Sequence, residues 1–195
     1  MKNIFLIGDS IRFGAGEKVC GYGVCVKEKL AGRAEVYAPD ENCRFAQYTL
    51  RYLHEWASKV PAKDIDIVHW NNGLWDLLHL CDDDAPFTPV EQYVQTLERI
   101  YRRIRFCFPN AKKIIFAANT PVIEARGRQG FMRYNSEIEQ YNAAAKALME
   151  QLGVQYNDLY AVAAAFGEAN RADWVHFDRT GSELLADAVI AAMGM

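Results

Sequence analysis

The sequence predicts an α/β protein in which a parallel sheet is covered by helices on both faces, in three α/β/α layers. Short apolar runs alternate with longer segments of helical periodicity along the whole chain, which is the pattern of parallel α/β folds. Ile4–Ile7 and Ile114–Ala117 lack the polar alternation of half-exposed strands and are typical of strands buried on both faces. We see no linker, repeat or low-complexity tract, so we expect a single domain over residues 1–195.

Five apolar or β-branched runs are the predicted strands. The first, Ile4–Ile7, ends at Gly8-Asp9-Ser10. Those that follow are Ala34–Tyr37, Ile65–Trp70, Ile114–Ala117 and Val154–Tyr156. Open parallel sheets bind their ligands beyond the carboxyl ends of the strands. The polar residues that follow these runs are therefore the first candidates for a site.

Helical patterns fill the gaps between the predicted strands. Two of them span Val24–Leu30 and Tyr48–Ala57, and a short helix is expected from Asp158 to Phe166. Three longer helices are expected to begin with capping boxes, in which a hydroxyl residue precedes a glutamate by three positions: Thr88 with Glu91 beside Pro89, Ser136 with Glu139, and Thr180 with Glu183. The Arg- and Gly-rich segment 123–134 is expected to form a loop over the strand ends, and whether it acts as a lid stays open.

The composition excludes several classes of function. A net charge of −3 argues against nucleic acid or an anionic membrane as a partner, because both would require a basic patch. The cluster of Arg102, Arg103 and Arg105 is expected on the solvated face of an amphipathic helix. No apolar stretch approaches membrane-spanning length, and no signal-peptide pattern is visible. The five cysteines are odd in number and form no C-x-x-C pair, which argues against a disulfide framework or a zinc site. We expect reduced thiols and a cytoplasmic location; the oligomeric state stays open.

The Asp9-Ser10 pair has two interpretations at this stage. Asp and Ser after a strand often cap the next helix, but a serine hydroxyl also becomes a nucleophile when a base removes its proton. Near the other end of the chain, Asp173-Trp174-Val175-His176 offers a base and an orienting carboxylate three residues apart. These groups favour a Ser10-His176-Asp173 triad.

The Gly8-Asp9-Ser10 and Asp173-x-x-His176 motifs, at the two ends of a chain with this strand–helix alternation, resemble the SGNH (GDSL-type) hydrolase family. The resemblance covers nearly the whole chain. It implies a flavodoxin-like fold whose five parallel strands have the order 2-1-3-4-5. It also implies Ser10 as the nucleophile, a small-molecule ester as the substrate, and neither a metal nor an organic cofactor.

The middle of the chain departs from the family pattern at the oxyanion hole. The second family block corresponds here to the loop 41–45, which lacks the usual glycine. We therefore expect a backbone N–H of Asn42 or Cys43 to join that of Ser10 as a donor. The third block normally reads G-x-N-D, but here it reads Gly73-Leu74-Trp75-Asp76. An indole does not simply replace an amide, so we take Asn71 as the expected side-chain donor.

Three further residues are candidates for substrate binding: Arg44, Asn72 and Trp75. Arg44 lies in the loop expected to face the site, where its guanidinium would meet an anionic or carbonyl group. Asn72 follows Asn71, although an Asn-Gly pair is also a common turn signal. Trp75 offers an aromatic wall for a sugar or an acyl group, and it would serve equally well as a core anchor.

The resulting hypothesis is a serine esterase that hydrolyses a small acyl ester, with an acetyl group on a carbohydrate or related metabolite as the expected substrate. One alternative is a thioesterase or lysophospholipase of the same family, which a long apolar groove beside Ser10 would favour. Another is a non-catalytic binding module with an incomplete oxyanion hole. A third is a mononucleotide binder using the Ser10–Gly16 loop, against which the Asp173-x-x-His176 motif argues, because a phosphate cradle does not require it.

Overall fold

A five-stranded parallel sheet lies at the centre of the computed structural model, which describes residues 1–16 and 19–195. Its strands are β1 (Lys2–Ile7), β2 (Ala34–Tyr37), β3 (Ile67–Trp70), β5 (Lys113–Ala117) and β7 (Gln155–Asn157). They lie in the order β2-β1-β3-β5-β7, and each neighbouring pair is parallel. Counted along the chain, this is the order 2-1-3-4-5, so the predicted sheet topology is confirmed.

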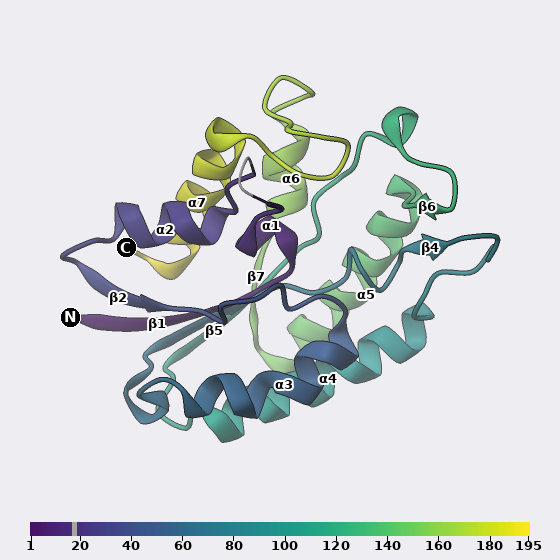
Figure 1. Ribbon diagram of the computed structural model, residues 1–195. Helices are drawn as coiled ribbons and strands as arrows, with labels where there is room; N and C mark the ends of the chain where they lie inside the picture. The colour runs from purple at the N-terminus through teal and green to yellow at the C-terminus, as the bar shows by residue number, and fades with distance from the viewer. Residues whose placement is uncertain (17–18) are drawn as a thin grey trace.

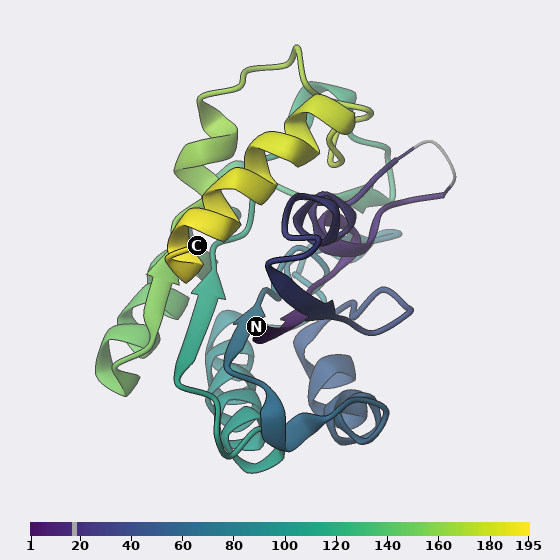
Figure 2. The ribbon, with the colours of Figure 1, turned by 90° about the vertical axis from the view of Figure 1, so that its left-hand side faces the viewer.

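Helices cover both faces of the sheet (Figure 1). One face carries α1 (Ser10–Phe13), α2 (Tyr22–Lys29), α6 (Leu159–Ala164) and α7 (Arg179–Met193); the other carries α3 (Ala46–Ser58), α4 (Val90–Cys107) and α5 (Asn135–Leu152). The view in Figure 2 has α7 above the sheet and α4 below it. The three-layer α/β/α prediction is confirmed. No helix in the described part of the chain is both long and apolar enough to cross a membrane.

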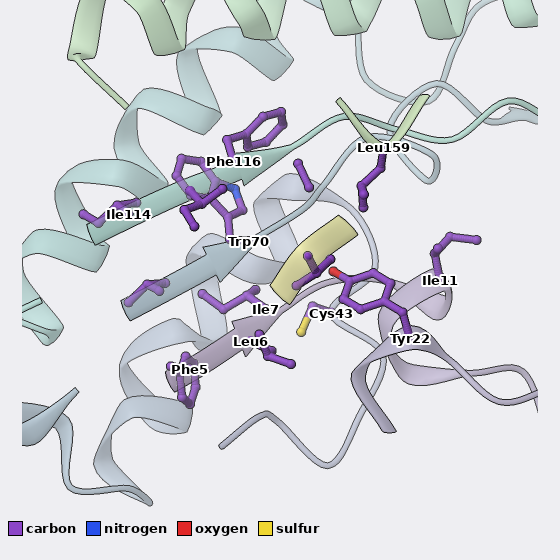
Figure 3. Packing of buried hydrophobic residues seen from close by; sticks show 14 of the residues in the cluster. Phe5, Leu6, Ile7, Ile11, Tyr22, Cys43, Trp70, Ile114, Phe116 and Leu159 are labelled. Carbon is purple, nitrogen blue, oxygen red and sulfur yellow. The ribbon is translucent and has the colours of Figure 1, made fainter. Parts of the chain in front are cut away.

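The strands are buried because both faces of the sheet are covered. In β1, all four residues Ile4–Ile7 are fully buried, as the continuous apolar run predicted. Figure 3 views this core from close by. The Phe5 ring packs 4.8 Å from that of Phe108, and the Trp70 indole meets Phe116 edge-on at 5.0 Å between ring centroids. This packing anchors the strands whose carboxyl ends carry the candidate site.

The three predicted capping boxes are wrong, because other residues begin these helices. The N-cap is Pro89 in α4 and Tyr134 in α5, and neither side chain caps its helix. In α7 the N-cap is Asp178 rather than Thr180, and its carboxylate accepts a hydrogen bond from the N–H of Gly181 at 2.8 Å. A capping box is identified from local sequence alone, whereas these starts depend on the path of the preceding loops.

The segment 123–134 is more ordered than an irregular loop. It contains a short 3-10 helix, η2 (Glu124–Arg126), and a strand, β6 (Phe131–Met132). Strand β6 pairs antiparallel with β4 (His79–Leu80), so that the chain after β3 is joined to the chain after β5 (Figure 1). A second 3-10 helix, η1 (Ala62–Asp64), precedes β3. Two-residue strands carry too little periodicity to be predicted, and a lid function of 123–134 stays a prediction.

Candidate active site

Ser10, His176 and Asp173 form one continuous hydrogen-bonded chain. The Ser10 Oγ lies 2.8 Å from His176 Nε2, and His176 Nδ1 lies 2.7 Å from Asp173 Oδ2. Ser10 is the first residue of α1, directly after β1, whereas Asp173 and His176 lie in the loop between α6 and α7. The sheet therefore brings together two motifs from opposite ends of the sequence. This is the geometry in which an imidazole can take a proton from a hydroxyl.

The turn before Ser10 is built by its neighbours. The Asp9 carboxylate accepts a hydrogen bond from the N–H of Ile11 at 2.9 Å, so Asp9 is the N-cap of α1. The capping and active-site interpretations of this pair are therefore compatible. Gly8 allows the turn to close, because a Cβ there would lie 2.6 Å from the Cβ of Arg12. Burial raises the pKa of Asp9, although the Ile11 N–H and the nearby charges of Arg133, His176 and Arg12 oppose that shift.

The Asp173 carboxylate organises the loop that carries His176. Its Oδ1 accepts hydrogen bonds from the N–H groups of Val175 and His176, both at 2.7 Å. Partial burial alone raises the pKa of Asp173, but these bonds and the contact with the His176 ring outweigh it and hold the pKa below its usual value. An ionised Asp173 accepts from the Nδ1–H of His176, which leaves Nε2 as the basic nitrogen facing Ser10.

The predicted backbone donors of the second block differ in their surroundings. The N–H of Cys43 donates to the carbonyl of Gly8 at 3.1 Å. The Asn42 side chain accepts from the N–H of Arg44 at 2.8 Å and shapes the turn. Cys43 is thus already paired within the loop. An N–H of Asn42 as an oxyanion donor stays a prediction.

The two asparagines after β3 are both committed to neighbouring groups. The amide of Asn71 donates to the carbonyl of Ala117 at 3.1 Å, at the end of β5. The amide of Asn72 donates to the carbonyl of Arg44 at 3.1 Å and to the Thr49 hydroxyl at 2.9 Å. Both side chains are buried. Donation by Asn71 to an oxyanion, and contact of Asn72 with substrate, stay predictions that require these bonds to be exchanged.

The two remaining candidates for substrate binding, Arg44 and Trp75, lie in different environments. Arg44 is exposed, and its guanidinium carbon lies 5.0 Å from the centre of the Tyr48 ring. Trp75 is partly buried, 6.4 Å from the Phe131 ring and 5.9 Å from the guanidinium of Arg133. A role in substrate binding stays a prediction for both. Arg133 was not identified from the sequence, because nothing in its local pattern marks it out.

Asp76, the last residue of the third block, ties this loop to α3. Its two carboxylate oxygens lie 3.1 and 3.0 Å from the N–H of Ala46, at the start of that helix. Burial raises the pKa of Asp76 to about 7, although the bonds from Ala46 and Thr88 oppose the shift. Among residues 1–16 and 19–195, no group of His, Cys, Asp and Glu side chains is arranged to hold a metal ion.

Gly73 has a backbone conformation and a neighbour that exclude larger residues. Its φ is +145°, and a Cβ there would lie 2.2 Å from the buried amide nitrogen of Asn119. We expect Gly73→Ala to lower the free energy of unfolding in urea by about 2–4 kcal/mol, from backbone strain and overpacking together. Gly32→Ala is the matched control: φ is +76°, but no atom lies within 4 Å of the added Cβ. Equal losses in both variants would contradict the steric argument.

A family comparison and a curated relative match nearly the whole chain. The model of the GDSL-like lipase/acylhydrolase family matches residues 6–184. The GDSL esterase/lipase CPRD49 of Arabidopsis thaliana is 26% identical over 218 residues, which cover 96% of this chain and 77% of the relative. Both comparisons span the segments that contain Ser10 and His176.

Solved structures share the fold. The lipase/acylhydrolase from Enterococcus faecalis gives a TM-score of 0.77 at 21% identity and covers 99% of this chain and 95% of that one. A catalytic mutant of an acetylxylan esterase from Geobacillus stearothermophilus gives 0.73 at 21% identity, covering 100% and 94%. At these identities the likeness demonstrates a common architecture with the parallel sheet described above.

Proposed function

The chain belongs to the GDSL-like lipase/acylhydrolase family, and we propose on that premise that it hydrolyses short acyl esters with Ser10 as the nucleophile. Membership makes it an ester-hydrolysing serine hydrolase. What we propose is which acyl group and which alcohol form the substrate, and which residues catalyse its hydrolysis. Acetyl esters of carbohydrates or of related small metabolites are the proposed substrates.

The observation that carries the proposal is the hydrogen-bonded chain from Ser10 to Asp173. Its two links, 2.8 Å from Oγ to Nε2 and 2.7 Å from Nδ1 to Oδ2, are within the range needed for proton transfer and for orienting a base. A module that only bound its ligand would not require a base aimed at a serine hydroxyl. This arrangement favours catalysis over the binding-module alternative.

In the first half of the proposed reaction, Ser10 Oγ attacks the carbonyl carbon of the ester while His176 Nε2 takes its proton. Asp173 stabilises the imidazolium that forms. The carbonyl oxygen becomes an oxyanion, to which the N–H of Ser10 is a proposed donor; as the first residue of α1, Ser10 has an N–H without an acceptor inside the helix. The tetrahedral intermediate then collapses, and Nε2–H protonates the leaving alcohol.

In the second half, water replaces the alcohol. His176 Nε2 removes a proton from the water as its oxygen attacks the acyl-Ser10 carbonyl. Collapse of the second tetrahedral intermediate breaks the bond between the acyl carbon and Oγ. The carboxylic acid leaves, and the proton returns from Nε2 to Ser10. Each turnover consumes one ester and one water.

Two observations support a short acyl chain. The structural neighbour from Geobacillus stearothermophilus is an acetylxylan esterase. Five cavities of about 140 to 430 Å³ on the described surface have linings that include neither Ser10 nor His176, so none of these five is a groove for an acyl chain at the nucleophile. A thioesterase or lysophospholipase would need such a groove.

The proposal is tested by hydrolysis of p-nitrophenyl acetate, butyrate and octanoate and by labelling with a fluorophosphonate. We expect kcat/KM to be highest for acetate and to fall with chain length, and we expect mass spectrometry to find the phosphonate on Ser10. A rate that rises toward octanoate would favour the lysophospholipase alternative. Failure to hydrolyse any ester, together with no labelling, would contradict the esterase proposal.

A further inference from the structure

The candidate site lacks one donor that its chemistry calls for. Trp75 stands where the family pattern has an asparagine. The nearby amides of Asn71 and Asn72 are bonded to main-chain and hydroxyl acceptors, and the N–H of Cys43 is bonded to Gly8. Hydrolysis through a tetrahedral intermediate requires donors aimed at the oxyanion, and each is usually worth a large factor in rate.

Arg133 is a buried cation held at this edge of the sheet. It follows β6 directly, and the pairing of β6 with β4 fixes that part of the chain beside the third block. Its side chain is only 3% exposed, and its Nε donates to the carbonyl of Leu74. The guanidinium lies among three rings, with its carbon 5.9 Å from Trp75, 5.2 Å from Phe131 and 5.5 Å from Trp174.

The two Nη nitrogens of Arg133 form no hydrogen bond or ion pair with the described residues. Among residues 1–16 and 19–195, no carboxylate forms an ion pair with this guanidinium. Its only hydrogen bond within those residues is made by Nε, and neither Nη atom belongs to the fully enclosed polar atoms that lack a partner. Burying a charge without a paired anion is costly, so an arginine kept in this state has donors available for a negative group.

Arg133 lies against the loop that carries Asp173 and His176. One of its ring contacts is Trp174, the residue next to Asp173. Its charge opposes the rise that burial causes in the pKa of Asp9, the residue before Ser10. Burial lowers the pKa of Arg133 to about 10, although the charges of Asp9 and Asp173 oppose the shift. The guanidinium is therefore a cation at neutral pH, beside the loop that carries the proposed base.

We propose that the Nη groups of Arg133 donate hydrogen bonds to the oxyanion of the tetrahedral intermediate and so fill the position that Trp75 leaves without a donor. The inference rests on the proposed esterase function. Arg133 keeps all its protons throughout, and the proton transfers stay with His176. Charge-assisted hydrogen bonds from a fixed guanidinium strengthen as charge develops on the oxygen. The Leu74 carbonyl and the three aromatic rings hold the guanidinium in place, so little reorganisation is needed in the transition state.

The test compares Arg133→Met and Arg133→Lys with Arg126→Met, using p-nitrophenyl acetate as a neutral substrate. Arg126 is an exposed arginine of the same segment, paired with Glu168 at 2.7 Å, so its loss controls for a change of charge. We expect kcat to fall roughly 100- to 1000-fold in Arg133→Met with KM within about threefold, as for loss of an oxyanion donor. In Arg133→Lys, kcat should fall at least about tenfold, because a single ammonium group replaces the planar guanidinium with its two Nη groups.

A second readout separates donation to the oxyanion from support of the fold. A small trifluoromethyl ketone adds to the serine and forms a hemiketal oxyanion at the same position. Its inhibition constant should weaken in the Arg133 variants by about the same factor as kcat/KM. Melting temperatures identify any variant that does not fold; if Arg133→Met fails, Arg133→Lys decides the question by the same two measurements.

The outcomes distinguish this inference from the function on which it rests. An inert wild type, unlabelled by a fluorophosphonate, would remove the esterase proposal and the inference together. An active wild type, together with a folded Arg133→Met or Arg133→Lys variant whose kcat is within about threefold of the wild-type value, would contradict the inference and leave the esterase proposal in place. So would a variant that binds a carboxylated ester less tightly but hydrolyses the neutral ester at the normal rate, because Arg133 would then recognise an anionic substrate group.

Discussion

Ser10→Ala is expected to lower kcat for p-nitrophenyl acetate by at least about 10⁴-fold, because removal of the nucleophile of a serine hydrolase prevents formation of the acyl-enzyme. The residual rate would come from donors and binding contacts that still act on a direct attack by water. Fluorophosphonate labelling should disappear completely. The measurement is a steady-state rate at saturating substrate, with mass spectrometry of the treated protein.

A second buried serine provides the control for this variant. The hydroxyl of Ser182, in α7, donates to the carbonyl of Cys20 at 2.6 Å. Ser182→Ala should lower the free energy of unfolding by about 1 kcal/mol, as for loss of one hydrogen bond, and should keep both activity and labelling. If Ser10→Ala hydrolyses the ester at the wild-type rate, Ser10 is not the nucleophile.

Asp173→Asn is expected to lower kcat by about 10³- to 10⁴-fold with little effect on KM. An amide at this position is neutral, so it no longer stabilises the imidazolium of His176. Its NH₂ group would also favour the tautomer with the proton on Nε2, and that nitrogen could then not accept the proton of Ser10. The measurement is kcat and KM for p-nitrophenyl acetate across pH.

Asp158→Asn is the matched control for Asp173→Asn. The Asp158 side chain also supports the backbone at a loop, accepting from the N–H of Ala161 at 3.0 Å where α6 begins. Its replacement should leave kcat within about twofold, since asparagine is also a good N-cap. Equal losses in the two variants would indicate that loop structure, rather than the charge beside His176, is what Asp173 contributes.

The strands were predictable because burial on both faces leaves a direct mark on the sequence. Ile4–Ile7 and Ile114–Ala117 are continuous apolar runs, and both lie within strands of the central sheet. A run of this kind does not depend on which other element covers it. The helix starts were less predictable: Thr88, Ser136 and Thr180 have the residue types of caps, but the chain enters each helix through a loop whose path is set by distant contacts.

The candidate site likewise has one part that could be predicted from the sequence and one part that could not. The Gly8-Asp9-Ser10 and Asp173-x-x-His176 motifs each consist of neighbouring residues, so their geometry is largely local and their resemblance to a family was evident. The proposed oxyanion donors come from several loops. Whether Asn71 is available depends on Ala117, the last residue of the neighbouring strand β5, and no pattern around Asn71 encodes that bond.

The sequence by itself determined the α/β class, the strand order implied by the family resemblance, and the two motifs at the ends of the chain, because these follow from local apolar patterns and contiguous residues. Only the tertiary structure decided that Ser10 Oγ and His176 Nε2 lie 2.8 Å apart, that the Asn71 and Asn72 amides are bonded elsewhere, and that a buried Arg133 lies beside Trp75. Each depends on contacts between residues far apart in the chain, which form only when the sheet brings the ends of its strands together.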